Sequence, residues 1–210
     1  MGKTYRLGMF PLERPIVPGQ LLPLTLFEPR YLALAQDLYA EPEPEFGVVG
    51  IERGREVGGG DTRASVGVVA RVLSLAAQPD HSWQLVATAT RRIRVESWRA
   101  DDPYPQAMVI DWPDPFEADL GDELSVVLDA TTALCEVAGH QTPEREFRVP
   151  DVNLEQPEMA LWQLVTFCGL GPHDLLELLA VPTTRQRAGR AAAMIDLRRE
   201  LLEGLGPSPG

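Results

Sequence analysis

The sequence predicts an α+β protein in which a mostly antiparallel β region precedes an α-helical one. Short runs rich in Val, Leu and Ile recur between turn residues over positions 1–113. From Leu120 onward the apolar period becomes helical. Strands and helices do not alternate, so we expect a small barrel or strongly bent sheet in the first region rather than a parallel βαβ sheet. Two domains are expected, at 1–113 and 114–210.

Six short strands are expected in the first region, each bounded by turn residues. They cover positions 21–25, 46–52, 65–75, 83–90, 92–98 and 107–112. In the fifth of these, Arg92, Arg94 and Glu96 alternate with Ile93 and Val95, which predicts one buried and one solvated face.

One helix is embedded among the strands, near positions 29–40. Pro29 suits the first helical position because its missing N–H has no intrahelical partner there. Glu28 stands where a carboxylate stabilises a helix N-terminus. The glycine-rich stretch 54–63 predicts a flexible connection between strands, since no helix with a lysine follows it as a phosphate-binding loop would need.

Four amphipathic helices with short connections are expected in the second region and predict a helical bundle packed against the β domain. Asp122 is expected to cap the first helix, while Pro157 and Pro172 open the second and third. Thr183 or Thr184 caps the fourth. The tail at 204–210 is expected to fray.

Composition indicates a soluble globular protein, with 24% charged and 44% hydrophobic residues. No apolar run approaches the roughly 18 residues that span a bilayer, and the N-terminus has no signal-peptide pattern. A cytoplasmic location without membrane association is therefore expected. The two cysteines, Cys135 and Cys168, lie in apolar helical segments and are expected to be buried and reduced.

Neither a metal site nor a catalytic motif is indicated. His81, His140 and His173 lie far apart and lack the spacing of a zinc site. Lys3 is the only lysine, so a Ser–Lys dyad has no partner residue, and the preceding glycine and strand of a Walker A motif are missing. We expect a protein without catalytic residues, cofactor or bound metal.

Four blocks of sequence carry a resemblance to a known family. They are, in order, Leu-Phe-Glu-Pro-Arg-Tyr at 26–31, Phe-Gly-Val-Val at 46–49, Gly-Val-Val-Ala-Arg-Val at 67–72, and Arg-Arg-Ile-Arg-Val at 91–95 followed by Pro-Tyr-Pro at 103–105. In this order the blocks resemble the Lon N-terminal domain, the substrate-binding region of the ATP-dependent Lon proteases. The resemblance covers roughly residues 5–113. It departs at Ala89-Thr90, where the family usually has a glycine.

The resemblance implies a PUA-like pseudo-barrel and a substrate-binding role. The chain would be a stand-alone protein without the ATPase and protease domains of Lon, acting as a non-catalytic polypeptide-recognition or adaptor module. Its partners would be unfolded or extended polypeptide segments, with a full-length Lon or another protease as a further possible partner. A monomer or weak dimer is expected, and the sequence leaves the oligomeric state open.

Candidate binding residues are the apolar and aromatic side chains at the start of the β region, with Arg30 beside them. They are Phe10, Leu12, Leu22, Leu24, Phe27, Arg30 and Tyr31. Most must be core, since short strands of a small barrel bury one face each. Exposed members would suit an extended polypeptide. Arg30 either pairs with Glu28 while Tyr31 packs on the barrel, or both residues rim a ligand site.

The alternative function is RNA binding through a basic strip made of Arg91, Arg92, Arg94 and Arg99. The strip lacks neighbouring exposed aromatic residues, which weakens this interpretation. The net charge of −12 also opposes it, because residues 1–113 have a net charge of −2 and residues 114–210 one of −10.

Overall fold

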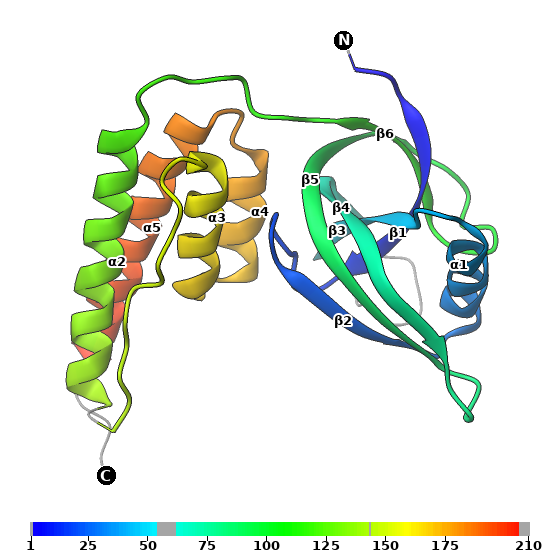
Figure 1. The fold of residues 1–210 in the computed structure, drawn as a ribbon, viewed down its shortest axis with the longest axis horizontal. Coiled ribbons are helices and arrows are strands. Elements are labelled where there is room, and N and C mark those ends of the chain that lie inside the picture. The colour runs from blue at the N-terminus through cyan, green and yellow to red at the C-terminus, as the bar shows by residue number, and fades with distance from the viewer. Residues whose placement is uncertain (1, 54–61, 143, 206–210) are drawn as a thin grey trace. The chain divides into compact units, whose positions relative to one another are not determined.

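The computed structural model describes residues 2–53, 62–142 and 144–205 of the chain. The chain divides into two compact units, Met1–Pro113 and Asp114–Gly210. We call these the β unit and the helical unit and describe each by itself (Figure 1). The α+β class predicted from the sequence is confirmed.

The β unit holds six strands and one helix among its described residues. In chain order they are β1 (Tyr5–Leu12), β2 (Leu21–Leu26), α1 (Pro29–Ala40), β3 (Glu45–Arg53), β4 (Thr62–Ala77), β5 (Trp83–Trp98) and β6 (Gln106–Asp111). Helix α1 has the predicted bounds and begins at Pro29. Its buried residues, Tyr31, Leu34, Ala35 and Leu38, follow the helical period and fix one face on the sheet.

The sheet curves back on itself. Its strand order is β2-β5-β4-β3-β1-β6, and β5 pairs with β6 as well, so five strands form a closed ring. Strand β5 makes this closure possible because it is 16 residues long: residues 83–88 pair with β2 and residues 93–98 with β6. Figure 1 shows β4 and β5 as long curved strands side by side. The predicted pseudo-barrel therefore has a ring of five strands and β2 attached to it at β5.

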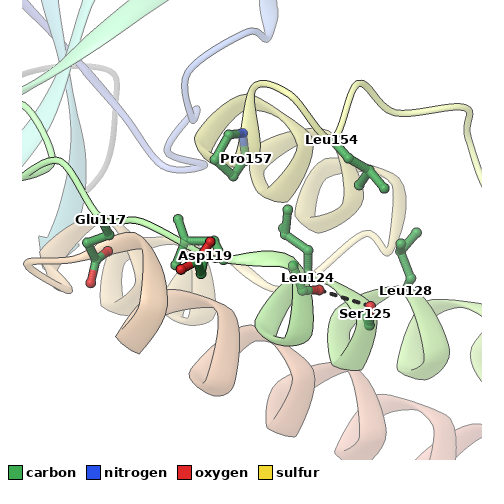
Figure 2. A pocket seen from close by; sticks show the side chains of 9 residues that line it. Glu117, Asp119, Leu124, Ser125, Leu128, Leu154 and Pro157 are labelled. Carbon is green, nitrogen blue, oxygen red and sulfur yellow. Dashed lines mark hydrogen bonds between the residues drawn. The ribbon is translucent and has the colours of Figure 1, made fainter.

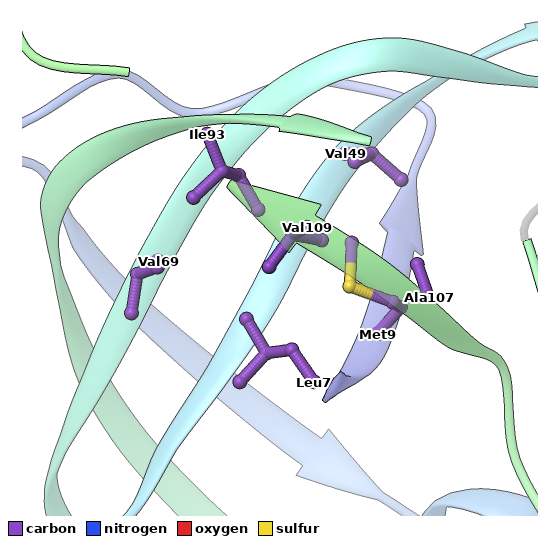
Figure 3. Close-up of a cluster of buried hydrophobic side chains, with 7 residues drawn as sticks. All are labelled: Leu7, Met9, Val49, Val69, Ile93, Ala107 and Val109. Atoms are coloured by element: carbon purple, nitrogen blue, oxygen red, sulfur yellow. The ribbon is translucent and has the colours of Figure 1, made fainter. Parts of the chain in front are cut away.

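Seven buried apolar side chains from all five ring strands form one core cluster. They are Leu7, Met9, Val49, Val69, Ile93, Ala107 and Val109 (Figure 3). Each large member contributes about 1.5–3 kcal/mol to folding by its burial. Gly67 lets β3 and β4 approach closely, since a Cβ there would overlap the carbonyl oxygen of Val48.

The helical unit contains α2 (Gly121–Gln141), α3 (Pro157–Phe167), α4 (Pro172–Ala180) and α5 (Thr184–Leu205). Prolines open α3 and α4 as predicted, and the hydroxyl of Thr183 accepts a hydrogen bond from the N–H of Gln186 at the start of α5. Asp122 does not cap α2: it lies in the first turn, and Leu120 is the N-cap residue.

A buried ion pair ties α5 to the start of the helical unit. The Arg187 side chain is fully buried, and its Nη2 lies 2.8 Å from Oδ1 of Asp114. It also donates to the carbonyl oxygens of Leu178 and Val181, and its guanidinium lies 4.6 Å from the ring centroid of Trp162. These contacts satisfy the buried charge, which is what makes its burial tolerable.

The strands differ from the sequence prediction at two places. The sequence did not predict β1, whose run is interrupted by Gly8 and Pro11, and it split β5 into strands at 83–90 and 92–98. β5 stays continuous because Arg91 and Arg92 find partners inside the β unit. The glycine-rich residues 54–61 and the tail residues 206–210 lie outside the described residues.

Candidate functional site

A groove of about 370 Å³ lies where β1, β2 and α1 meet in the β unit. We call it the β1–β2 groove. Its lining comes from the end of β1, the second half of β2 and the first turn of α1. The lining residues are Phe10, Glu13, Leu24, Thr25, Leu26, Phe27, Glu28 and Tyr31.

Strand pairing explains why the sheet is open here. The first half of β1, Tyr5 to Gly8, pairs with β6, whereas its second half, Met9 to Leu12, pairs with β3. Strand β2 pairs with β5 alone among the described strands. The described part of the sheet therefore has no ladder between β1 and β2, and the groove occupies this position.

Aromatic side chains form the floor and rim of the groove. The rings of Phe10 and Tyr31 pack with centroids 4.1 Å apart, and both residues are buried. Phe27 follows β2 directly and is 62% exposed. A large apolar side chain held at the edge of an aromatic floor is typical of a surface that binds apolar segments.

Arg30 and Glu28 form an ion pair beside the groove, with 3.1 Å between Nη2 and Oε2. The guanidinium of Arg30 also lies 4.5 Å from the ring centroid of Tyr31. This geometry agrees with the structural interpretation of both residues. It also fixes the first turn of α1 and with it the rim of the groove.

Four of the seven predicted binding residues line the groove together: Phe10, Leu24, Phe27 and Tyr31. Leu12 and Leu22 are buried and do not line it, and Arg30 lies beside it. The sequence prediction missed four lining residues, namely Glu13, Thr25, Leu26 and Glu28. Each is next in the chain to a predicted residue. The prediction therefore agrees with the groove lining more closely in its chain segment than in its individual residues.

The predicted arginine strip is largely occupied by internal contacts. Arg91 donates two hydrogen bonds to the carboxylate of Glu45, at 2.9 and 2.8 Å, and a third to Asp111. Arg92 is buried, which corrects its expected place on a solvated face. Its guanidinium and that of Arg94 lie 4.3 and 3.5 Å from the ring centroid of Trp112. Three of the four arginines therefore hold the β unit together.

Tyr5 completes the cluster around Arg91. Its hydroxyl donates to Asp111 and accepts a hydrogen bond from Arg91. Burial, followed by the hydrogen bond to Asp111, raises the pKa of Tyr5 to about 12. Burial and a hydrogen bond to Asp37 likewise raise the pKa of Tyr104 to about 12.

A smaller pocket of about 210 Å³ lies within the helical unit (Figure 2). Its lining includes Glu117, Asp119, Leu124, Leu128 and Leu154, and no aromatic residue. The Ser125 hydroxyl beside them is occupied, because it donates to the carbonyl oxygen of Gly121. This pocket offers less volume and fewer large apolar contacts than the β1–β2 groove.

Residues 2–53, 62–142 and 144–205 contain no group of metal ligands and no helix that could span a membrane. No three His, Cys, Asp or Glu side chains gather there as a metal ion would require. The helices of this part are all too short or too polar to cross a bilayer. Cys135 and Cys168 are buried as predicted, and burial raises the pKa of both thiols, which disfavours the reactive thiolate.

The fold and the groove together define an α+β protein whose candidate site is an apolar groove on the β unit. A model of the substrate-binding domain of the ATP-dependent protease La (Lon) matches residues 6–196. The chain belongs to this family, as its sequence blocks predicted.

Two solved structures share the fold. A Lon N-terminal domain protein from Xanthomonas campestris is 23% identical, with a TM-score of 0.64, covering 90% of this chain and 98% of that one. The N-terminal domain of a Mycobacterium avium complex Lon protease is 14% identical, with a TM-score of 0.60 and coverages of 91% and 98%. No curated protein matches the chain.

Proposed function

We propose that this protein is a non-catalytic module that recognises unfolded or extended polypeptide at the β1–β2 groove. The observation that carries the proposal is the half-open aromatic surface made by buried Phe10 and Tyr31 and exposed Phe27. Membership of the Lon substrate-binding family supports the ligand class. As an adaptor, the module would present captured segments to a full-length Lon or another protease.

Binding should be weak and broad. A shallow groove that accepts many sequences cannot be closely complementary to any one of them, so Kd should lie in the micromolar range or above. Apolar contacts depend little on salt, whereas RNA binding loses affinity steeply as salt rises because neutralised phosphates release counterions.

The test measures anisotropy of a labelled, permanently unfolded polypeptide and of a labelled single-stranded RNA at about 50 and 200 mM salt. Phe27→Ser should weaken polypeptide binding by about tenfold, the loss expected for an aromatic anchor. Leu73→Ser is the matched control, because Leu73 is 54% exposed and does not line the groove. Tight, salt-sensitive RNA binding without a polypeptide signal would reject the proposal in favour of the RNA alternative.

A further inference from the structure

Among the described residues, no strand pairs with one edge of β2, and this edge borders the β1–β2 groove. β2 is the terminal strand of the sheet order, paired with β5 on one side. Its residues Leu24, Thr25 and Leu26 line the groove. A strand edge of this kind presents a row of backbone N–H and C=O groups that can pair with another chain.

The register fixes which backbone groups point to the open side. The N–H of Ala89 donates to the carbonyl of Gln20, and the carbonyl of Ala89 accepts from the N–H of Gly19, so both backbone groups of Ala89 face the β2 side. Hydrogen-bonded pairs alternate with non-bonded ones. Leu22, Leu24 and Leu26 therefore bond to β5, and Leu21, Pro23 and Thr25 direct their backbone groups away from it. Pro23 agrees with this assignment, since proline is tolerated where no ladder N–H is needed.

The open edge thus offers three carbonyl oxygens but only two N–H groups, from Leu21 and Thr25. The groove beside it is lined by the carboxylates of Glu13 and Glu28 and by no basic side chain, although Arg30 pairs with Glu28 from outside the lining. The excess of carbonyl oxygens over N–H groups favours a guest that supplies N–H donors. An extended polypeptide with apolar side chains at alternate positions fits this edge and the apolar lining of the groove.

We infer that the polypeptide binds by adding a strand to the open edge of β2, with every second side chain entering the β1–β2 groove. This inference rests on the proposed function and specifies how that site works. Backbone hydrogen bonds are common to all sequences, so this mode gives breadth, while the groove selects apolar side chains at alternate positions. Exposed Phe27, the first residue after β2, lines the same groove.

The protein-side test replaces Thr25, whose N–H faces the open edge. Thr25→Pro removes this donor without removing a bond to β5, and Pro23 already occupies the equivalent position two residues earlier. Thr25→Val is the matched control, because it also loses the side-chain contact to Gln84 but keeps the N–H. Thr25→Pro should weaken binding by about fivefold, the value of one net hydrogen bond, and Thr25→Val should leave it unchanged. Circular dichroism confirms that both variants are folded.

The ligand-side test uses a blocked seven-residue peptide of alternating valine and lysine in two N-methylated forms. One form is methylated at the valines and the other at the inner lysines. Alternation fixes the register, because a one-residue slip would turn every valine out of the groove. One methylated form should bind more than about tenfold more weakly than the other, since only alternate N–H groups face β2.

These measurements separate strand addition at β2 from the more general proposal of polypeptide recognition at the groove. Strand addition is overturned if the two methylated forms bind with equal affinity while the unmethylated peptide still binds. If Phe27→Ser still weakens binding in that case, polypeptide recognition at the groove stands. Failure of the unmethylated peptide and the unfolded polypeptide to bind overturns both.

Discussion

At the scale of single residues, Arg91 joins four strands of the β unit. It lies on β5 and contacts Glu45 at the start of β3, Asp111 at the end of β6 and the hydroxyl of Tyr5 on β1. Two of these contacts are ion pairs with partly exposed partners. The cluster therefore links the strands on both sides of the ring closure between β5 and β6.

Removing this side chain should destabilise the β unit. We expect Arg91→Ala to lower the free energy of unfolding by about 1–2 kcal/mol, because the carboxylates lose charge-assisted hydrogen bonds while solvent compensates them in part. Arg99→Ala, at an exposed position, is the control and should stay within about 0.5 kcal/mol of the wild type. Urea unfolding followed by tryptophan fluorescence measures both. Equal stabilities of the two variants would mean that the cluster adds nothing.

Tyr5 and Tyr104 predict a pH dependence of stability. Their pKa values rise from 10.0 to about 12 on folding, so the folded state holds both protons more tightly than the unfolded chain. The resulting stability is complete below about pH 10 and is lost as the pH rises towards about 12. The thermal midpoint of the wild type should fall as the pH rises across this range. The midpoint of the double variant Tyr5→Phe/Tyr104→Phe should fall less over the same range. Tyr39→Phe, at a mostly exposed position, serves as the control. A double variant with the wild-type slope would refute the assignment.

At the scale of elements, two glycines have opposite roles. In β4, a Cβ at Gly67 would overlap the Val48 carbonyl of β3, so Gly67→Ala should cost about 1–3 kcal/mol through overpacking. In α5, a Cβ at Gly189 meets nothing within 4 Å, so Gly189→Ala should stabilise the helical unit by about 0.5–1 kcal/mol. Calorimetric scans measure the change in thermal midpoint of each variant relative to the wild type, which should be negative for Gly67→Ala and positive for Gly189→Ala. Two shifts of the same sign would contradict the packing described for these elements.

The elements that the sequence predicted correctly are those with local signals. Helix α1 was predicted with both ends because Pro29 starts it and apolar residues follow the helical period. Strand β1 was missed because Gly8 and Pro11 conceal its pattern. β5 was divided because nothing near Arg91 in the chain shows that Glu45 and Asp111 will neutralise it. Contacts across 20 or 46 positions are absent from any sequence window.

The candidate site was predictable for the same reason that α1 was. All residues that line the β1–β2 groove lie between Phe10 and Tyr31, within one continuous segment. What the sequence could not provide was exposure. Phe10 and Phe27 have the same side chain and each follows an apolar residue, yet the first is 5% exposed and the second 62%. Only the pairing of β1 with β3, and the end of β2 before Phe27, decides between them.

At the scale of the whole molecule, charge is divided unequally between the two units. The helical unit carries most of the net charge of −12, while the β unit is close to neutral. We expect the acidic second half to repel nucleic acid without opposing apolar contacts at the groove of the first half. The expectation that the helical bundle packs against the β unit stays a prediction.

We further predict that residues 1–113 fold when expressed alone. The β unit has its own core and a closed ring of strands, which are the properties of an independent domain. The fragment must include Trp112, because Arg92 and Arg94 stack on its ring. A fragment ending at residue 111 should therefore unfold at a lower temperature. Dispersed amide signals in NMR spectra would support the prediction, and an unfolded 1–113 fragment would contradict it.

Pro23 has a consequence for contacts between copies of the protein. Laid antiparallel about this position, two open β2 edges would bring proline opposite proline, and neither could supply the N–H that the other's carbonyl requires. Since β2 is the one terminal strand among those described, such pairing would join two copies, and it would lose its central hydrogen bonds. A foreign strand with its own N–H would not. An edge that accepts a foreign strand, as proposed above, would in this way be kept from pairing with the same edge of a second copy.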